Sequence, residues 1–126
     1  MPHVVIEGDV DLEEYARSFE PILIRNGRDV IRASTLYRDQ SGRALLLEAL
    51  VIESGRKLPF YLKLTAHDRG SATVRVDPLT HPDPSEGVHT LVSRVASDLV
   101  ELTPGARVRS SSVLVPSALG HKGDSQ

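Results

Sequence analysis

The chain has 126 residues, of which 40% are hydrophobic and 25% are charged, and its formal net charge is −2. This composition favours one globular domain, and the charge gives no general attraction for the phosphate backbone of nucleic acids. The absence of cysteine excludes a disulfide framework and a thiolate nucleophile. No apolar run is long enough to cross a membrane and the first residues lack a signal-peptide pattern, so we expect a cytoplasmic protein that binds neither membranes nor nucleic acids.

The first elements predicted along the chain are a strand and a bent helix. The β-branched stretch 3–7 predicts the strand. Either Asp9 or Asp11 can cap a helix over 12–26, with acidic residues in its first turn. Apolar side chains near helical spacing support this helix: Leu12, Tyr15, Phe19, Ile22 and Leu23. We expect Pro21 to bend it, because proline removes a backbone donor.

Strands separated by turn signals fill the middle of the chain. They are predicted over 30–37, 44–53, 58–66 and 72–76. Ser54-Gly55 predicts a hairpin turn between the second and third of these strands. Pro59 stands near the beginning of its strand, where a missing backbone donor costs least.

The prolines of 77–84 predict an irregular connection, which is followed by a long helix. Asp83 is the expected N-cap, with Pro84 at the first helical position and Glu86 at capping-box spacing. One face of this helix is apolar, through Val88, Leu91, Val92, Val95, Leu99 and Leu102. A last strand is predicted over 107–115. The sequence therefore predicts a single domain, 1–116, and a mobile polar tail, 117–126.

The order strand, helix, strand occurs at both ends of the chain. This pattern predicts an α+β fold, in which two β-α-β units form a mixed sheet with two helices on one face and an inserted β-hairpin. Because several strands are apolar on both faces, a partner subunit is the simplest cover for the other face. A different α+β domain of ferredoxin-like layout is the alternative.

The second residue gives the strongest indication of chemistry. Removal of Met1 would leave Pro2 with a free imino group, whose ordinary pKa is roughly 7.7–8.0. Burial or a nearby cation lowers such a pKa further, into the range that a general base needs near neutral pH. The five histidines show no close pair with a third ligand, so we expect no metal ion.

The opening residues Pro2-His3-Val4-Val5-Ile6-Glu7 resemble the tautomerase superfamily, in particular the 5-carboxymethyl-2-hydroxymuconate isomerase family. The resemblance continues through Phe19-Glu20-Pro21 and the pair Ile31-Arg32, and it covers roughly residues 2–36. It implies a tautomerase-like fold assembled as a homotrimer, without metal or organic cofactor.

The resemblance also implies the roles of individual residues. Pro2 would be the catalytic base and acid of an isomerase of aromatic catabolism, which moves a proton in an enol or dienol carboxylic acid. Arg32 would hold the small carboxylate substrate, together with Arg56 or Arg69. Ser34 stands where the family often has a second basic residue. This departure favours the alternative, a non-catalytic tautomerase-fold assembly or binding protein.

Overall fold

The computed structural model describes residues 2–115, which contain seven strands and two helices. The first elements are β1 (His3–Glu7), α1 (Leu12–Ser18), β2 (Ile22–Asn26), β3 (Asp29–Arg38) and β4 (Ala44–Glu53). They are followed by β5 (Arg56–His67), β6 (Ser71–Val76), α2 (Glu86–Leu102) and β7 (Arg107–Ser111). The expected tail, 117–126, lies outside the described residues. Within the described part, neither helix is long and apolar enough to cross a membrane.

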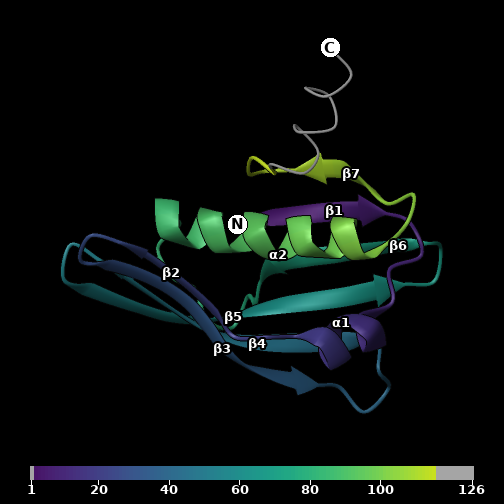
Figure 1. Ribbon diagram of the computed structural model, residues 1–126, viewed down its shortest axis with the longest axis horizontal. Helices are drawn as coiled ribbons and strands as arrows, with labels where there is room; N and C mark the ends of the chain where they lie inside the picture. The colour runs from purple at the N-terminus through teal and green to yellow at the C-terminus, as the bar shows by residue number, and fades with distance from the viewer. Residues whose placement is uncertain (1, 116–126) are drawn as a thin grey trace.

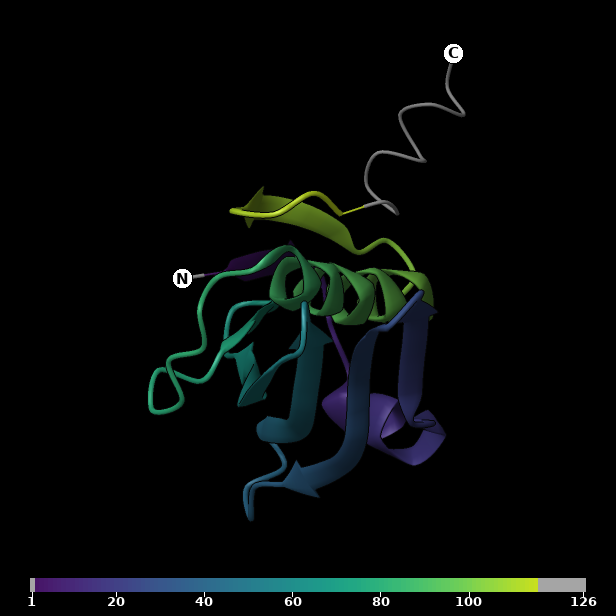
Figure 2. The ribbon, with the colours of Figure 1, turned by 90° about the vertical axis from the view of Figure 1, so that its left-hand side faces the viewer.

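All seven strands form one antiparallel sheet in the order β2-β3-β4-β5-β6-β1-β7. The sheet curls around α2, which contacts β1, β3, β4 and β6 (Figures 1 and 2). The prediction of two β-α-β units in a mixed, tautomerase-like sheet is therefore wrong. A β-α-β unit needs two parallel strands joined by a crossover helix. Here β1 instead pairs antiparallel with β6 and β7, which come from much later in the chain.

The predicted helix over 12–26 is wrong after Ser18. Asp11 caps α1 by accepting a hydrogen bond from the Glu14 amide, but the helix lasts only two turns. Pro21 then precedes β2 and does not bend a helix. In β2 the side chain of Ile22 is buried and that of Leu23 is 55% exposed, which is the two-residue period of a strand. Both residues also fit helical spacing, and this coincidence produced the error.

The long helix α2 begins at Glu86 and has the predicted apolar face except at Leu102, which is 36% exposed. Ser85 is its N-cap in place of the expected Asp83, because the Ser85 hydroxyl accepts a hydrogen bond from the Val88 amide at 3.2 Å. The buried side chains include Val88, Leu91, Val92, Val95 and Leu99, all without exposed surface. The last strand, β7, ends at Ser111 and is shorter than predicted.

The first turn of α2 lies directly against the end of β4. The Gly87 amide donates to Glu53 Oε2 at 2.9 Å, so this carboxylate holds the N-terminus of the helix. A Cβ atom at Gly87 would lie 2.6 Å from Val51 Cγ1. Glycine is therefore required here by close packing and not by backbone conformation.

Replacement of this glycine should destabilise the protein. We expect Gly87→Ala to lower the free energy of unfolding by about 1–3 kcal/mol, because the added methyl group overpacks the contact with Val51. Chemical denaturation measures this change. Thr90→Ala, on the exposed side of the same helix, is the control, and it should cost much less. Equal effects of the two substitutions would contradict the packing argument.

Candidate functional site

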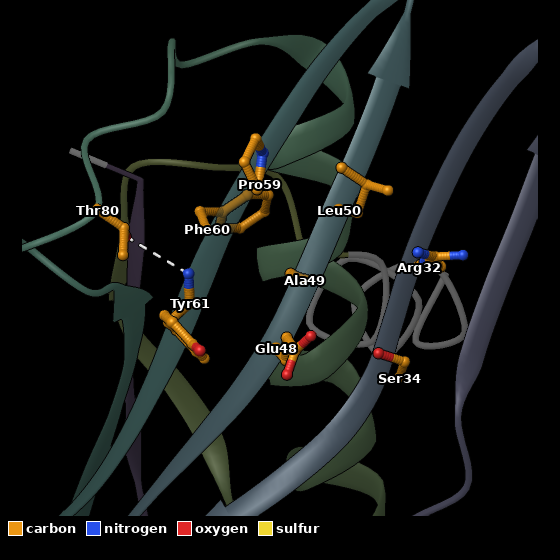
Figure 3. A pocket seen from close by; sticks show the side chains of 9 residues that line it. All are labelled: Arg32, Ser34, Glu48, Ala49, Leu50, Pro59, Phe60, Tyr61 and Thr80. Carbon is orange, nitrogen blue, oxygen red and sulfur yellow. Dashed lines mark hydrogen bonds between the residues drawn. The ribbon is translucent and has the colours of Figure 1, made fainter.

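The face of the sheet that points away from α2 carries a shallow groove of about 410 Å³ over β3, β4 and β5 (Figure 3). We call it the outer groove. Its lining combines charged, hydroxyl, aromatic and aliphatic side chains: Arg32, Ser34, Glu48, Ala49, Leu50, Pro59, Phe60, Tyr61 and Thr80. A concave surface with a few convergent polar groups and apolar walls is the usual form of a small-molecule site.

The hairpin between β4 and β5 determines which side chains meet in the groove. Ser54 and Gly55 both have positive φ, of 50° and 77°, as a two-residue type I′ turn requires. This tight turn fixes the register, so that Glu48 lies opposite Tyr61 and Leu50 lies opposite Pro59. The four side chains share one face of the sheet, because strand residues two apart point the same way.

The loop between β6 and α2 forms one wall of the groove. Strand β6 ends at Val76, so the part of β5 before Leu62 has no strand on that side. The loop replaces the strand: Tyr61 donates its amide to Thr80 Oγ1 at 3.4 Å and accepts at its carbonyl from the Asp77 amide at 2.7 Å. Pro59 lies two residues before Tyr61 and faces the same open edge, where no backbone donor is needed.

A bulge in β3 shapes the opposite wall. The register between β3 and β4 shifts between Ala33 and Thr35, which leaves Ser34 as the extra residue. Because of this extra residue, both Arg32 and Tyr37 lie on the outer face, although five positions separate them. Ala33 and Leu36 point inward instead, toward the core.

Two opposite charges lie at the groove. Arg32 is exposed on β3, and no hydrogen bond or ion pair to another residue of 2–115 involves its guanidinium. Glu48, on β4, accepts a hydrogen bond from the Tyr37 hydroxyl at 3.0 Å. This bond, together with the negative charge of Glu48, raises the pKa of the Tyr37 phenol above its ordinary value. The groove thus offers a free cation and an anion held in place by a neighbour.

The structure does not bring Pro2 and Arg32 together within one chain. Pro2 is buried just before β1 and, like Val4 and Ile6, faces inward. Its carbonyl accepts a hydrogen bond from the Val76 amide at 3.3 Å. Arg32 points outward from β3, and β4, β5 and β6 lie between the two strands.

The other predicted arginines also lie apart from each other. Arg56 begins β5 and forms an ion pair with Asp83, which links the hairpin to the loop before α2. Arg69 is exposed in the turn after the other end of β5. The whole length of β5, 12 residues, lies between the two. Arg32 alone of the predicted residues lines the outer groove.

Three groove residues were not predicted as a site: Glu48, Tyr61 and Thr80. Tyr37, which donates to Glu48 from beside the groove, was not predicted either. The sequence did contain a signal for Glu48 and Tyr61. If both predicted strands pair through a two-residue turn at Ser54-Gly55, these two residues lie opposite each other. Nothing in the sequence indicated that Thr80 would approach β5. Among residues 2–115, no cluster of three or more potential ligand residues could hold a metal ion.

Comparison with protein-family models, curated proteins and solved structures finds no match to this chain. The resemblance of the opening residues to the tautomerases therefore stays a prediction, and the argument for a function depends on the geometry of the groove.

The pair of Tyr37 and Glu48 gives a direct test of that geometry. We expect Glu48→Ala to lower the pKa of Tyr37 toward its ordinary value of 10.0, because the hydrogen bond and the charge that favour the neutral phenol are both lost. Since the pair raises this pKa in the folded state, its contribution to stability is present below about pH 10 and is lost as the pH rises through the folded pKa. Titration of ¹³C-labelled tyrosine by NMR measures the shift.

The matched control is Glu101→Ala, which removes an exposed carboxylate from α2 and should leave Tyr37 unchanged. An unaltered Tyr37 pKa in Glu48→Ala would mean that the two side chains do not meet in solution.

Proposed function

We propose that this protein binds small aromatic carboxylates in the outer groove, with Arg32 as the anchor for the carboxylate. The observation that carries this proposal is a guanidinium without a partner among residues 2–115, at the rim of a groove with partly apolar walls. A guanidinium binds a carboxylate through two parallel hydrogen bonds, and this geometry favours planar anions over other ligands.

The width of the groove indicates the size of the ligand. Adjacent strands lie about 4.8 Å apart, so the side chains of β3 and β5 are separated by roughly 10 Å. An aromatic ring joined to a carboxylate by one or two carbons spans this distance. Its ring would lie over Leu50 and Pro59, beside the ring of Tyr61, where offset or edge-on packing is favourable.

Glu48 determines the orientation of the ligand in the groove. A carboxylate placed near Glu48 would be repelled, whereas a hydroxyl group there could donate a hydrogen bond to it. The groove is therefore expected to prefer ligands with a carboxylate at one end and either an apolar ring or a phenolic hydroxyl at the other. 4-Hydroxyphenylacetate and phenylpyruvate have this form.

Binding should depend on Arg32. We expect Arg32→Gln to weaken the binding of 4-hydroxyphenylacetate roughly 10- to 100-fold, which corresponds to the loss of a charge-assisted hydrogen bond worth about 1.5–3 kcal/mol. Titration calorimetry, or NMR titration if the affinity is low, measures this change.

Arg109→Gln serves as the control, because Arg109 is an exposed arginine on β7, far from the groove. Benzylamine, which replaces the carboxylate with an ammonium group, should bind less well than phenylacetate. Equal binding by the wild type and Arg32→Gln, or a preference for benzylamine, would overturn the proposal.

Isomerase activity stays a prediction that only the sequence supports. It requires the removal of Met1 and a catalytic imino group at Pro2. If the protein ketonises phenylenolpyruvate by the tautomerase mechanism, we expect the rate to fall at least 100-fold in Pro2→Ala, because the base is removed. Mass spectrometry of the mature N-terminus and an absorbance assay test both requirements. A retained Met1, or equal rates for the two proteins, would exclude this mechanism.

The homotrimer, the absence of a cofactor and the cytoplasmic location are kept as parts of the proposal. The lack of cysteine agrees with a reducing compartment, and sedimentation measurements test the oligomeric state.

A further inference from the structure

A second cavity, of about 360 Å³, lies at the beginning of β4 and shares no lining residue with the outer groove. We call it the end cavity, because it lies beside the turn between β3 and β4 at the lower end of the sheet in Figure 2. Part of its surface is apolar. Ala44 and Leu46 point outward from β4, and Tyr37 of β3 lies directly opposite Leu46.

Two opposite charges line the end cavity. Lys63 is half-buried on β5, opposite Leu46, and Asp39 is exposed in the turn after β3. Among residues 2–115, the Lys63 ammonium group forms no hydrogen bond or ion pair. Its charge still acts on Asp39, so the two groups lie near each other without touching. The cavity therefore contains a cation and an anion that are not neutralised by direct contact.

Asp39 is held in place by its own turn. The Ser41 hydroxyl donates to Asp39 Oδ2 at 2.5 Å, and the amides of Gln40 and Ser41 also donate to the carboxylate. These hydrogen bonds, that of the Ser41 hydroxyl first, keep the pKa of Asp39 below its ordinary value, and the charge of Lys63 lowers it further. The cavity thus has a fixed, ionised acceptor on one side.

The separated charges discriminate between ligand classes. An anion beside Lys63 is repelled by Asp39, and a cation beside Asp39 is repelled by Lys63. A zwitterion avoids both repulsions, because each of its charges meets the opposite charge of the protein. Arg38 also lines the cavity, but its guanidinium is paired with Glu13 at 2.6 Å and so leaves this balance nearly unchanged.

We propose that the end cavity binds a free apolar α-amino acid, whose carboxylate contacts the Lys63 ammonium and whose ammonium group contacts Asp39. The two charged groups of an α-amino acid are attached to one carbon, so they suit two partners that are close but not in contact. The apolar side chain would lie over Ala44 and Leu46, against the ring of Tyr37, and bury their remaining apolar surface.

The volume sets the size of the ligand. At about 30 Å³ for each water-sized group, the cavity holds about twelve non-hydrogen atoms, which admits leucine and phenylalanine. The end cavity is separate from the outer groove, and this inference does not depend on the binding of aromatic carboxylates there.

Three compounds with the same carbon skeleton test the proposal: L-leucine, 4-methylpentanoate and 3-methylbutylammonium. The second lacks the ammonium group of leucine and the third lacks its carboxylate. Each is titrated into the full chain while amide resonances are followed by NMR. We expect leucine to bind with a dissociation constant on the order of millimolar and to shift resonances of 37–46 and Lys63. The other two compounds should bind several-fold less tightly.

Two substitutions should change the preference in opposite directions. Asp39→Asn keeps a residue that favours the same turn. It should weaken leucine binding about fivefold and strengthen the binding of 4-methylpentanoate, because the repulsion of the carboxylate is removed. Lys63→Gln should weaken leucine binding to a similar extent and strengthen the binding of 3-methylbutylammonium. A general loss of structure would weaken all three compounds alike.

Lys57→Gln is the control, since Lys57 is an exposed cation near the other end of β5 and should not affect any of the three affinities. Leucine binding no tighter than that of both related compounds would overturn the proposal. An unchanged order of affinities in both variants, or shifts confined to residues of the outer groove, would also overturn it. Because neither variant alters Arg32, such a failure is distinct from a failure of the carboxylate proposal.

Discussion

The burial of one helix inside a curled sheet is the constraint on which the rest of the structure depends. Val88, Leu91, Val95 and Leu99 of α2 have no exposed surface, and each such side chain contributes roughly 1.5–3 kcal/mol when it is fully buried. A single helix with its side chains is only about 10–12 Å wide, so a flat sheet of seven strands could not enclose it. Curvature brings both β1 and β3 into contact with α2.

In this arrangement the side chains of the sheet form two groups, those that point inward to the core and those that point outward. Inward residues such as Leu47, Leu62 and Val74 are completely buried in the core and have little freedom to change. Outward residues on the same strands have no structural layer above them in the described part of the chain. Charged and aromatic residues can therefore occupy the outer face without disturbing the core, and the proposed carboxylate site is built from them.

The sequence was sufficient to predict most individual strands and the long helix, because their periodicity agrees with their environment. It failed for 19–26, where Ile22 and Leu23 fit two periods at once and only the pairing of β2 with β3 decides between them. The strand order was also not predicted, because no local sequence feature indicates that β1 pairs with β6 and β7.

The candidate sites were predicted only in part, for a related reason. Arg32 was found through a family resemblance, and the geometry then placed it in a groove without Pro2. Glu48 and Tyr61 follow from the turn at Ser54-Gly55, which is a local feature.

The bulge at Ser34 has a consequence for how this protein tolerates insertions and deletions. Along a strand, an even or odd count of residues decides whether a side chain belongs to the interior or to the surface, and Ser34 changes that count once in the middle of β3. If Ser34 were deleted and the rest of the sequence were unchanged, the side chains after Ala33 would change faces. Leu36 would then point to solvent and Tyr37 toward the core. The chemistry of the outer face is thus encoded as much by the number of residues in β3 as by their identities.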